Sequence, residues 1–134
     1  MKKQVCITTI IFSVLIIVLI FVAAQTPIDF SLKAADYVKE LGWEIDENPI
    51  DIAIINLPSK FDAVYRQYNE IQKEAGFDLT EYLGKKVVRY TFAINNFDGA
   101  EGVRVNVLMH KGSIIGGDIM TVAIDGFMLP LKKR

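Results

Sequence analysis

The fold is decided by residues 88–120, which read VRYTFAINNFDGAEGVRVNVLMHKGSIIGGDIM. Apolar and mostly polar side chains alternate over 88–94 and again over 103–110. This period of two is typical of β-strands with one buried face. The connections between the runs contain the Asn, Asp and Gly that favour tight turns, and 113–120 returns as a third strand. The stretch therefore predicts an antiparallel meander of three strands.

Residues upstream of the meander predict two helices and one more strand. Apolar residues recur at helical spacing over 26–41 and 59–75, and Thr26 and Ser59 begin their capping signals. Between the helices, 50–57 is rich in β-branched residues and is expected to join the edge of the meander. Because helices precede strands, the sequence predicts the α+β class, with two helices packed across one face of a mainly antiparallel sheet of about four strands.

Residues 5–24 form an apolar run that is broken only by two threonines and one serine. At 1.5 Å per residue, a helix of about 20 residues spans roughly 30 Å, the thickness of the hydrocarbon core of a membrane. The run therefore predicts one transmembrane helix that makes the membrane a partner of the protein. Residues 1–25 are interpreted as a transmembrane anchor or uncleaved signal segment, and 26–134 as a single α+β domain.

The charges around this run predict its orientation. Lys2 and Lys3 precede it, and the next charge is Asp29. The positive-inside rule then places the N-terminus in the cytoplasm and the domain outside, in a single-pass protein of the cell membrane. An alternative interpretation is a signal peptide, because the small residues up to Ala24 fit a cleavage site and would release a secreted domain. Both interpretations export the domain.

The composition excludes several kinds of chemistry. One cysteine, Cys6, lies in the apolar run, and one histidine, His110, lies in the domain. No thiolate ligand or Cys nucleophile is available to the domain, and we expect no metal site and no cofactor. Residues 29–81 carry 12 acids and 5 bases, a net charge of −7, whereas 82–134 carry 4 acids and 8 bases, a net charge of +4. The overall negative balance argues against nucleic acid as a partner.

No catalytic residue is assigned, and the candidate partner-binding residues are Arg104, Asn106, His110, Gly116, Gly117 and Asp118. The first three share one face of their strand because side chains alternate. A Ser–His–Asp set with Ser113 is conceivable, but no nucleophile elbow accompanies it, so the histidine is interpreted as a strand residue beside a turn. The glycine pair is interpreted as a β-bulge or a close approach of the backbone, and alternatively as room for a peptide or glycan on the sheet.

Several phrases of the sequence occur together in a known family: YVKELGWE at 37–44, FDAVYRQYN at 61–69, GFDL at 76–79, IGGD at 115–118 and GFM at 126–128. As a set, over residues 26–131, they resemble a family of small Firmicute proteins with an N-terminal membrane segment and one domain of unknown function. The resemblance implies a location and an architecture. It implies no catalytic residue, because the family has no established activity.

The sequence predicts a membrane-anchored, extracytoplasmic binding or accessory domain without chemistry of its own. It would contact another envelope protein or a peptide through the sheet or through a groove between helix and sheet. Two alternatives stay open. One is a small hydrolase of an envelope polymer that uses acidic residues and His110, and the other is a purely structural protein of the envelope. A cleft with convergent polar groups and perturbed pKa values would distinguish the hydrolase from the binding domain.

Overall fold

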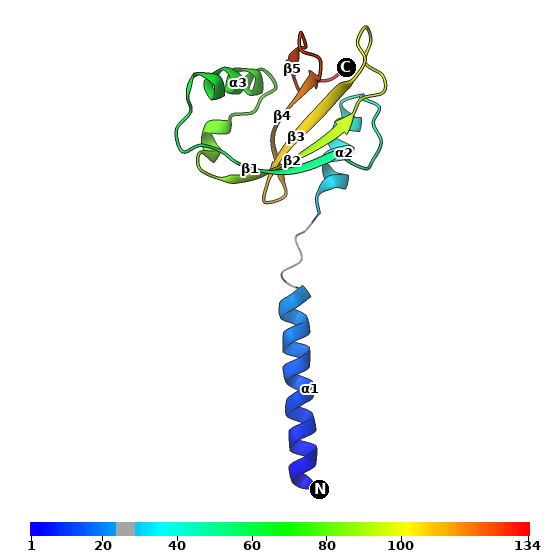
Figure 1. Cartoon of the computed structure of the whole chain (residues 1–134), viewed down its shortest axis with the longest axis vertical. Coiled ribbons are helices and arrows are strands. Elements are labelled where there is room, and N and C mark those ends of the chain that lie inside the picture. Colours follow the sequence, from blue (N-terminus) through cyan, green and yellow to red (C-terminus); the bar gives the residue numbers. More distant parts are fainter. Residues whose placement is uncertain (24–28) are drawn as a thin grey trace.

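The computed structural model describes residues 1–23 and 29–134 (Figure 1). Their elements, in chain order, are α1 Lys2–Ala23, α2 Ser31–Glu40, β1 Asp51–Asn56, α3 Ala63–Glu74, the short 3-10 helix η1 Leu79–Tyr82, β2 Lys86–Ala93, β3 Val103–His110, β4 Ser113–Thr121 and β5 Met128–Pro130.

The sheet contains five strands in the order β1-β2-β3-β4-β5, and each neighbouring pair is antiparallel. The α+β class, the meander of β2, β3 and β4, and the edge position of β1 are confirmed. The expected number of about four strands is wrong, because the chain end adds a fifth. Strand β5 has three residues, and Met128 in it pairs with Met120 on β4. A run this short carries too little alternation to be recognised from sequence.

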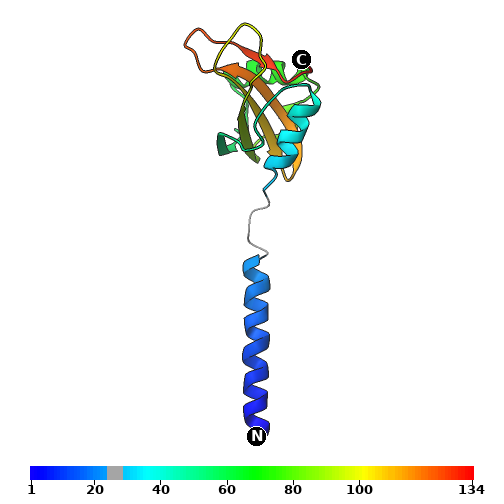
Figure 2. The same cartoon turned by 90° about the vertical axis from the view of Figure 1, so that its right-hand side faces the viewer.

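The two faces of the sheet are covered by different helices, as the two views in Figures 1 and 2 show. Helix α2 packs Ala34, Ala35 and Val38 on one face, against Phe92 and Val105 among others. Helix α3 and η1 cover part of the opposite face. There the buried cluster consists of Leu57, Phe61, Leu79, Val87, Leu108 and Ile115. The expectation that both helices lie across one face is therefore wrong.

The reason for the second covered face lies in the strands. Side chains of β2 and β3 alternate between the face that α2 covers and the opposite face. The opposite face carries Val87 and Leu108, which are apolar, and also Arg89 and Asn106, which are polar. The apolar part of this face needs a cover, since exposed apolar surface is unfavourable in water. Helix α3 provides that cover at one end of the strands. The polar part of the same face, next to α3, is not covered by the helix.

Helix α1 runs over Lys2–Ala23, but in the part of the chain that the structure describes no helix is both long and apolar enough to cross a membrane. The prediction of a transmembrane helix over 5–24 is therefore wrong. A crossing needs about 20 predominantly apolar residues. Thr8 and Ser13 lie within the run, and each hydroxyl donates to the carbonyl four residues earlier, at 2.9 and 2.8 Å. The alternative cleavage position near Ala24 lies outside the described residues.

The predicted bulge at the glycine pair is confirmed. Met109 on β3 pairs with Ile114, whereas Leu108 pairs with Gly116, so Ile115 is the extra residue of β4. A β-carbon at Gly116 would lie 2.7 Å from Oε1 of Gln72 on α3. The missing side chain at this position lets α3 approach the sheet.

The second glycine is enclosed on the opposite face. A β-carbon at Gly117 would lie 2.5 Å from Cδ2 of Leu131, and it would overlap the backbone oxygen of Asn106. Leu131 belongs to the buried cluster on the sheet face that α2 covers, and it is 2 % exposed. Gly117 therefore makes room for the chain end to pack beside β4.

We predict that Gly117→Val destabilises the domain by about 1–3 kcal/mol, because the new side chain forces Leu131 and the backbone of β3 to move. For a domain of this size the melting temperature should fall by about 4–8 °C per kcal/mol. Thermal unfolding followed by circular dichroism measures the shift. Ser113→Val is the matched control, since Ser113 is an exposed residue of the same strand. Equal melting temperatures for both variants would contradict the close-approach interpretation.

Candidate functional site

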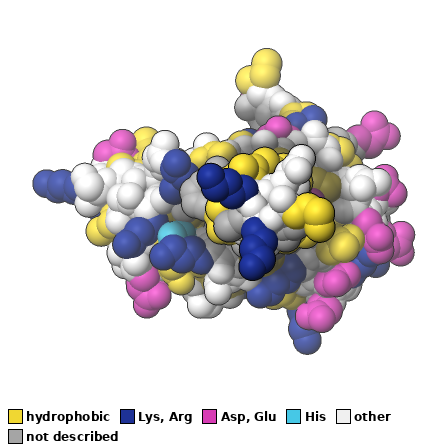
Figure 3. Space-filling view, turned by 90° about the horizontal axis from the view of Figure 1, so that it is seen from below, with side chains coloured by type: hydrophobic (Ala, Val, Ile, Leu, Met, Phe, Trp, Pro, Cys, Tyr) yellow, Lys and Arg dark blue, Asp and Glu magenta, His cyan; other side chains and the backbone are white. Residues whose placement is uncertain are grey.

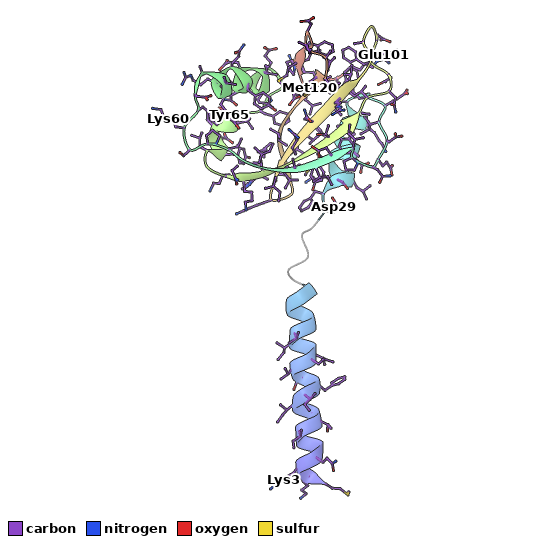
Figure 4. All side chains as sticks on the ribbon, viewed as in Figure 1. Lys3, Asp29, Lys60, Tyr65, Glu101 and Met120 are labelled. Carbon is purple, nitrogen blue, oxygen red and sulfur yellow. The ribbon has the colours of Figure 1, made fainter. Side chains whose placement is uncertain are left out.

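A groove of about 570 Å³ lies between α3 and the adjoining part of the sheet face. Residues from α3 and from all five strands line it. Tyr65 on α3 and Met120 on β4 are two of them, and both are labelled in Figure 4. Most of the lining is apolar, and its main apolar members are Ile55, Val64, Tyr65, Ile71, Met120 and Met128. The volume is in the range of pockets that hold a small ligand or a short peptide segment.

Helix α3 begins where its sequence provides a cap. Asp62 is the N-cap residue, and its carboxylate accepts the backbone N–H of Tyr65 at 2.9 Å. The predicted start at Ser59 is thus a few residues early. The rings of Phe61 and Tyr65 stack with centroids 5.3 Å apart. This contact packs the residue before the N-cap against the first turn of α3. Gly76, with φ +86°, ends the helix in the left-handed conformation that glycine adopts most readily.

Two buried amides anchor α3 to its surroundings. Asn69 Oδ1 accepts the backbone N–H of Leu79 at 2.7 Å, and Asn69 Nδ2 donates to Asp78 at 3.0 Å. Gln72 Oε1 accepts the backbone N–H of Gly117 at 2.8 Å. Asn69 therefore caps the adjoining loop, whereas Gln72 ties the helix to β4. The position of α3, and with it one wall of the groove, depends on these hydrogen bonds.

A chain of hydrogen bonds runs across the polar floor of the groove. The Thr91 hydroxyl donates to Asn106 Oδ1 at 2.7 Å, and Asn106 Nδ2 donates to Asp118 Oδ1 at 2.9 Å. The Tyr68 hydroxyl on α3 donates to the other oxygen, Asp118 Oδ2, at 2.7 Å. Register places Thr91, Asn106 and Asp118 in one row across β2, β3 and β4. We name these three residues, together with Tyr68, the polar chain.

Burial perturbs both titratable members of the polar chain. It raises the pKa of Asp118, while the hydrogen bonds from Tyr68 and Asn106 and the charge of Arg89 lower that pKa by smaller amounts. Burial also raises the pKa of Tyr68, and the neighbouring Asp118 raises it further. The phenol therefore keeps its proton and donates it in the hydrogen bond to Asp118. Because a phenol so hard to ionise cannot take up a proton, Tyr68 is unsuited to general-base chemistry.

Arg89 provides the positive charge of the floor. One of its terminal nitrogens, Nη2, contacts Oδ2 of Asp51 at 2.9 Å, and the pair joins β2 to β1. The Nε atom is buried and has no hydrogen-bond partner among the described residues. A buried donor without an acceptor is unfavourable, because it has lost its water.

The sequence-predicted candidates separate into four locations. Asn106 and Asp118 belong to the polar chain, and Gly116 and Gly117 are packed beneath α3 and Leu131. Arg104 pairs with Met120 on the same strands but does not line the groove.

His110 lies at the other end of β3, four residues and about 13 Å from Asn106. Its Nδ1 is 2.9 Å from the Lys86 carbonyl oxygen, and its ring meets Tyr82 edge-on. The Ser–His–Asp set is not assembled, since Ser113 pairs with His110 whereas Asp118 pairs with Asn106. Figure 3 shows that Lys and Arg side chains gather around the histidine, whereas Asp and Glu gather at the opposite side of that view. In the described part of the chain, no three acidic, His or Cys side chains form a group that could hold a metal ion.

Sequence reasoning missed Tyr68 and Arg89 as site residues. Arg89 occupies a polar position of β2 with the same alternation as Asn106 on β3. The rule that paired strands share faces could have placed Arg89, Thr91 and Asn106 together. Tyr68 carries no such signal, because an aromatic residue at helical spacing predicts a core position and says nothing of its hydroxyl.

Within the described residues, the fold and the groove define a small α+β domain with a ligand-sized site, and the Ser–His–Asp set is not assembled there. The chain belongs to the family described as "Domain of unknown function (DUF4830)", whose model matches residues 37–119. The match includes the whole polar chain and Arg89. The resemblance to a domain of unknown function is thereby confirmed, whereas the match carries no statement on bacterial group or membrane attachment. No curated protein and no solved structure matches the chain.

We predict that Tyr68→Phe destabilises the domain by about 1–3 kcal/mol, because it leaves a buried oxygen of Asp118 without its donor. Tyr65→Phe is the matched control, since Tyr65 lies one helical turn earlier and its hydroxyl takes no part in the polar chain. The control should change the free energy of unfolding by less than about 0.5 kcal/mol. Urea titration of both variants measures the difference. A loss of the same size in both variants would contradict a special contribution of the hydrogen bond between Tyr68 and Asp118.

Proposed function

We propose that the protein is a non-catalytic, extracytoplasmic binding domain that takes an apolar segment of a partner protein into the groove beside α3. The observation that carries the proposal is the groove itself, in which apolar walls surround a polar floor whose side chains are held in place by hydrogen bonds. Such a combination is typical of binding sites, because the walls supply affinity and the few fixed polar groups supply specificity.

The apolar walls remain accessible in the free protein. Val64 is 72 % exposed and Met128 is 41 % exposed, and both line the groove. Burying these side chains against a partner would remove apolar surface from water, which is the main favourable term in protein association. Methionines at two lining positions, 120 and 128, can also adapt their flexible side chains to different partner residues.

The alternative of a hydrolase receives less support from this site. Asp118 is the one acid among the described residues that line the groove, and the paired carboxylates of a glycosidase have no counterpart in that lining. His110 lies outside the groove, and Tyr68 holds its proton too firmly to act as a base. We therefore favour binding over catalysis.

The extracytoplasmic location rests on the sequence. Lys2 and Lys3 precede an uncharged run, an arrangement that is typical of export signals. Protease added to intact protoplasts of a Gram-positive host that express the full chain should digest the domain without lysis. A cytoplasmic protein of the same host is the control and should stay intact. Protection of both proteins until lysis would contradict the location and leave the groove proposal standing.

Selection of linear twelve-residue peptides from a displayed library tests the groove directly. The purified full chain should enrich peptides with apolar residues, and these should bind Val64→Glu at least about tenfold more weakly. The introduced carboxylate sits at the groove wall and opposes burial of apolar side chains. The fold should tolerate it, because position 64 is exposed and lies in the first turn of α3, where a negative charge is favourable.

Val122→Glu is the matched control for this selection. Val122 is 56 % exposed and does not line the groove, so its variant should bind the selected peptides as the unaltered protein does. Failure to enrich any peptide would contradict the proposal. So would peptides that bind Val64→Glu with unchanged affinity.

A further inference from the structure

We infer that the outer edge of β1 is a self-association surface, on which β1 of a second copy of this chain pairs antiparallel about a two-fold axis. The sheets of the two copies would then join into one continuous sheet. The inference concerns the assembly of the protein, and it does not depend on what the groove binds.

Strand β1 leaves backbone hydrogen-bonding groups without a partner strand. It stands at one end of the strand order, and among the described residues β2 is the one strand that pairs with it. The Leu57 N–H donates to the Lys85 carbonyl oxygen at 2.9 Å, and successive residues of a strand direct their backbone groups to alternate sides. Ile52, Ile54 and Asn56 therefore direct theirs away from β2. Such an edge is a template for a further strand.

The opposite edge of the sheet is protected against association, whereas the edge at β1 is open. Strand β5 has three residues, and Pro130 in it has no N–H to donate. Short edge strands and edge prolines prevent pairing between sheets. Strand β1 has six residues in regular register, without proline or lysine. Its one charged residue, Asp51, stands at its first position and is paired with Arg89.

Apolar side chains flank the open edge. Ile52 is 53 % exposed and Ile54 is 67 % exposed. They pair with Tyr90 and Val88, so both lie on the sheet face that α2 covers elsewhere. Their exposure shows that α2 does not reach this part of the face. A strand added at the edge would remove part of their apolar surface from water.

The outward-directed residues determine the register of the pair. When Ile54 lies opposite Ile54 of the second copy, Ile52 of each copy lies opposite Asn56 of the other. Each of these pairs exchanges two backbone hydrogen bonds, about six in all. The two Ile54 side chains then meet at the two-fold axis, with β-carbons about 5 Å apart. This register uses every outward-directed residue of both strands.

The two ends of β1 carry opposite charge. Segment 44–51 contains four acids and no base: Glu44, Asp46, Glu47 and Asp51. Lys39 and Arg89 pair with two of these acids. Segments 57–60 and 84–86 flank the other end of β1 and contain three bases and no acid: Lys60, Lys85 and Lys86. One end of the edge is therefore acidic and the other end is basic.

This charge division selects an antiparallel second copy as the occupant. Figure 3 shows the division, and His110 marks the basic end because its Nδ1 is 2.9 Å from the Lys86 carbonyl oxygen. The ends are about 20 Å apart along the strand, beyond the screening length of about 8 Å at physiological salt, so they cannot pair within one chain. A two-fold axis places each acidic end beside the basic end of the other copy. Parallel pairing would place like charges together.

Sedimentation velocity of the purified full chain tests the association. We expect a concentration-dependent dimer. Ile54→Lys should raise its dissociation constant at least about tenfold, because two like charges would lie opposite each other at the two-fold axis. Val122→Lys is the matched control, since Val122 is 56 % exposed and lies outside β1, and it should dimerise as the unaltered chain does. Circular dichroism checks that both variants are folded.

Two results of this experiment would overturn the inference. One is a chain that stays monomeric at about 100 µM, which would leave the edge to a strand of a different protein. The other is association that Ile54→Lys leaves unchanged, which would place the contact elsewhere on the chain.

Cross-linking tests the direction of pairing. Cys6→Ser removes the one native thiol, and Ile52→Cys and Asn56→Cys are introduced separately into that background. The two chains are mixed with a short thiol-specific cross-linker, and isotopic labelling of one chain identifies the products by mass. Unlike chains should be joined at least about fivefold more often than like chains, because antiparallel pairing sets positions 52 and 56 opposite each other and holds like positions about 13 Å apart.

Equal yields of like and unlike products would contradict antiparallel pairing and overturn the inference. Neither experiment involves a groove ligand, whereas the peptide selection with Val64→Glu tests the groove alone. Failure of the self-association and failure of the binding function can therefore be told apart.

Discussion

The contact of α3 with β4 at the glycine bulge is the interaction on which the rest of the site depends. Because Gly116 has no side chain, Gln72 can reach the backbone N–H of Gly117, and the helix lies against the strand at that point. Tyr68, one helical turn earlier, is then in position to donate to Asp118. The residues nearer the start of α3 form a groove wall. One close approach thus sets both the depth of the groove and the orientation of its polar floor.

The polar chain has an energetic consequence for the whole domain. A buried carboxyl group is costly unless its oxygens are hydrogen-bonded, and Asp118, at 2 % exposure, has a donor on each oxygen. The three strands and the helix that supply these partners must keep their relative positions for the cost to be offset. The chain therefore makes the site rigid before any ligand enters, and a prearranged site loses less conformational entropy on binding.

Several parts of the structure were predictable because they depend on local patterns. Alternation identified the strands of the meander, β-branched residues identified β1, and a glycine pair inside a strand identified the bulge. The transmembrane helix was a wrong prediction from a local pattern, since no helix among the described residues is long and apolar enough to cross a membrane. Of the site, Asn106 was found by its strand face and Asp118 by its place after the glycine pair, whereas Arg104 and His110 share the face of Asn106 but lie away from the groove.

The sequence by itself determined that helices precede a meander, which segments form β1 to β4, which face of a strand each side chain takes, and where the backbone must pass closely at glycine. These properties follow from side-chain periods and from steric limits that act within a few residues. Only the tertiary structure decided that α2 and α3 take opposite faces, that the chain end adds β5, and that Tyr68 and Arg89 join Asp118 at one floor. Those outcomes depend on packing between residues that are tens of positions apart, where shape and burial rather than local sequence select the partner.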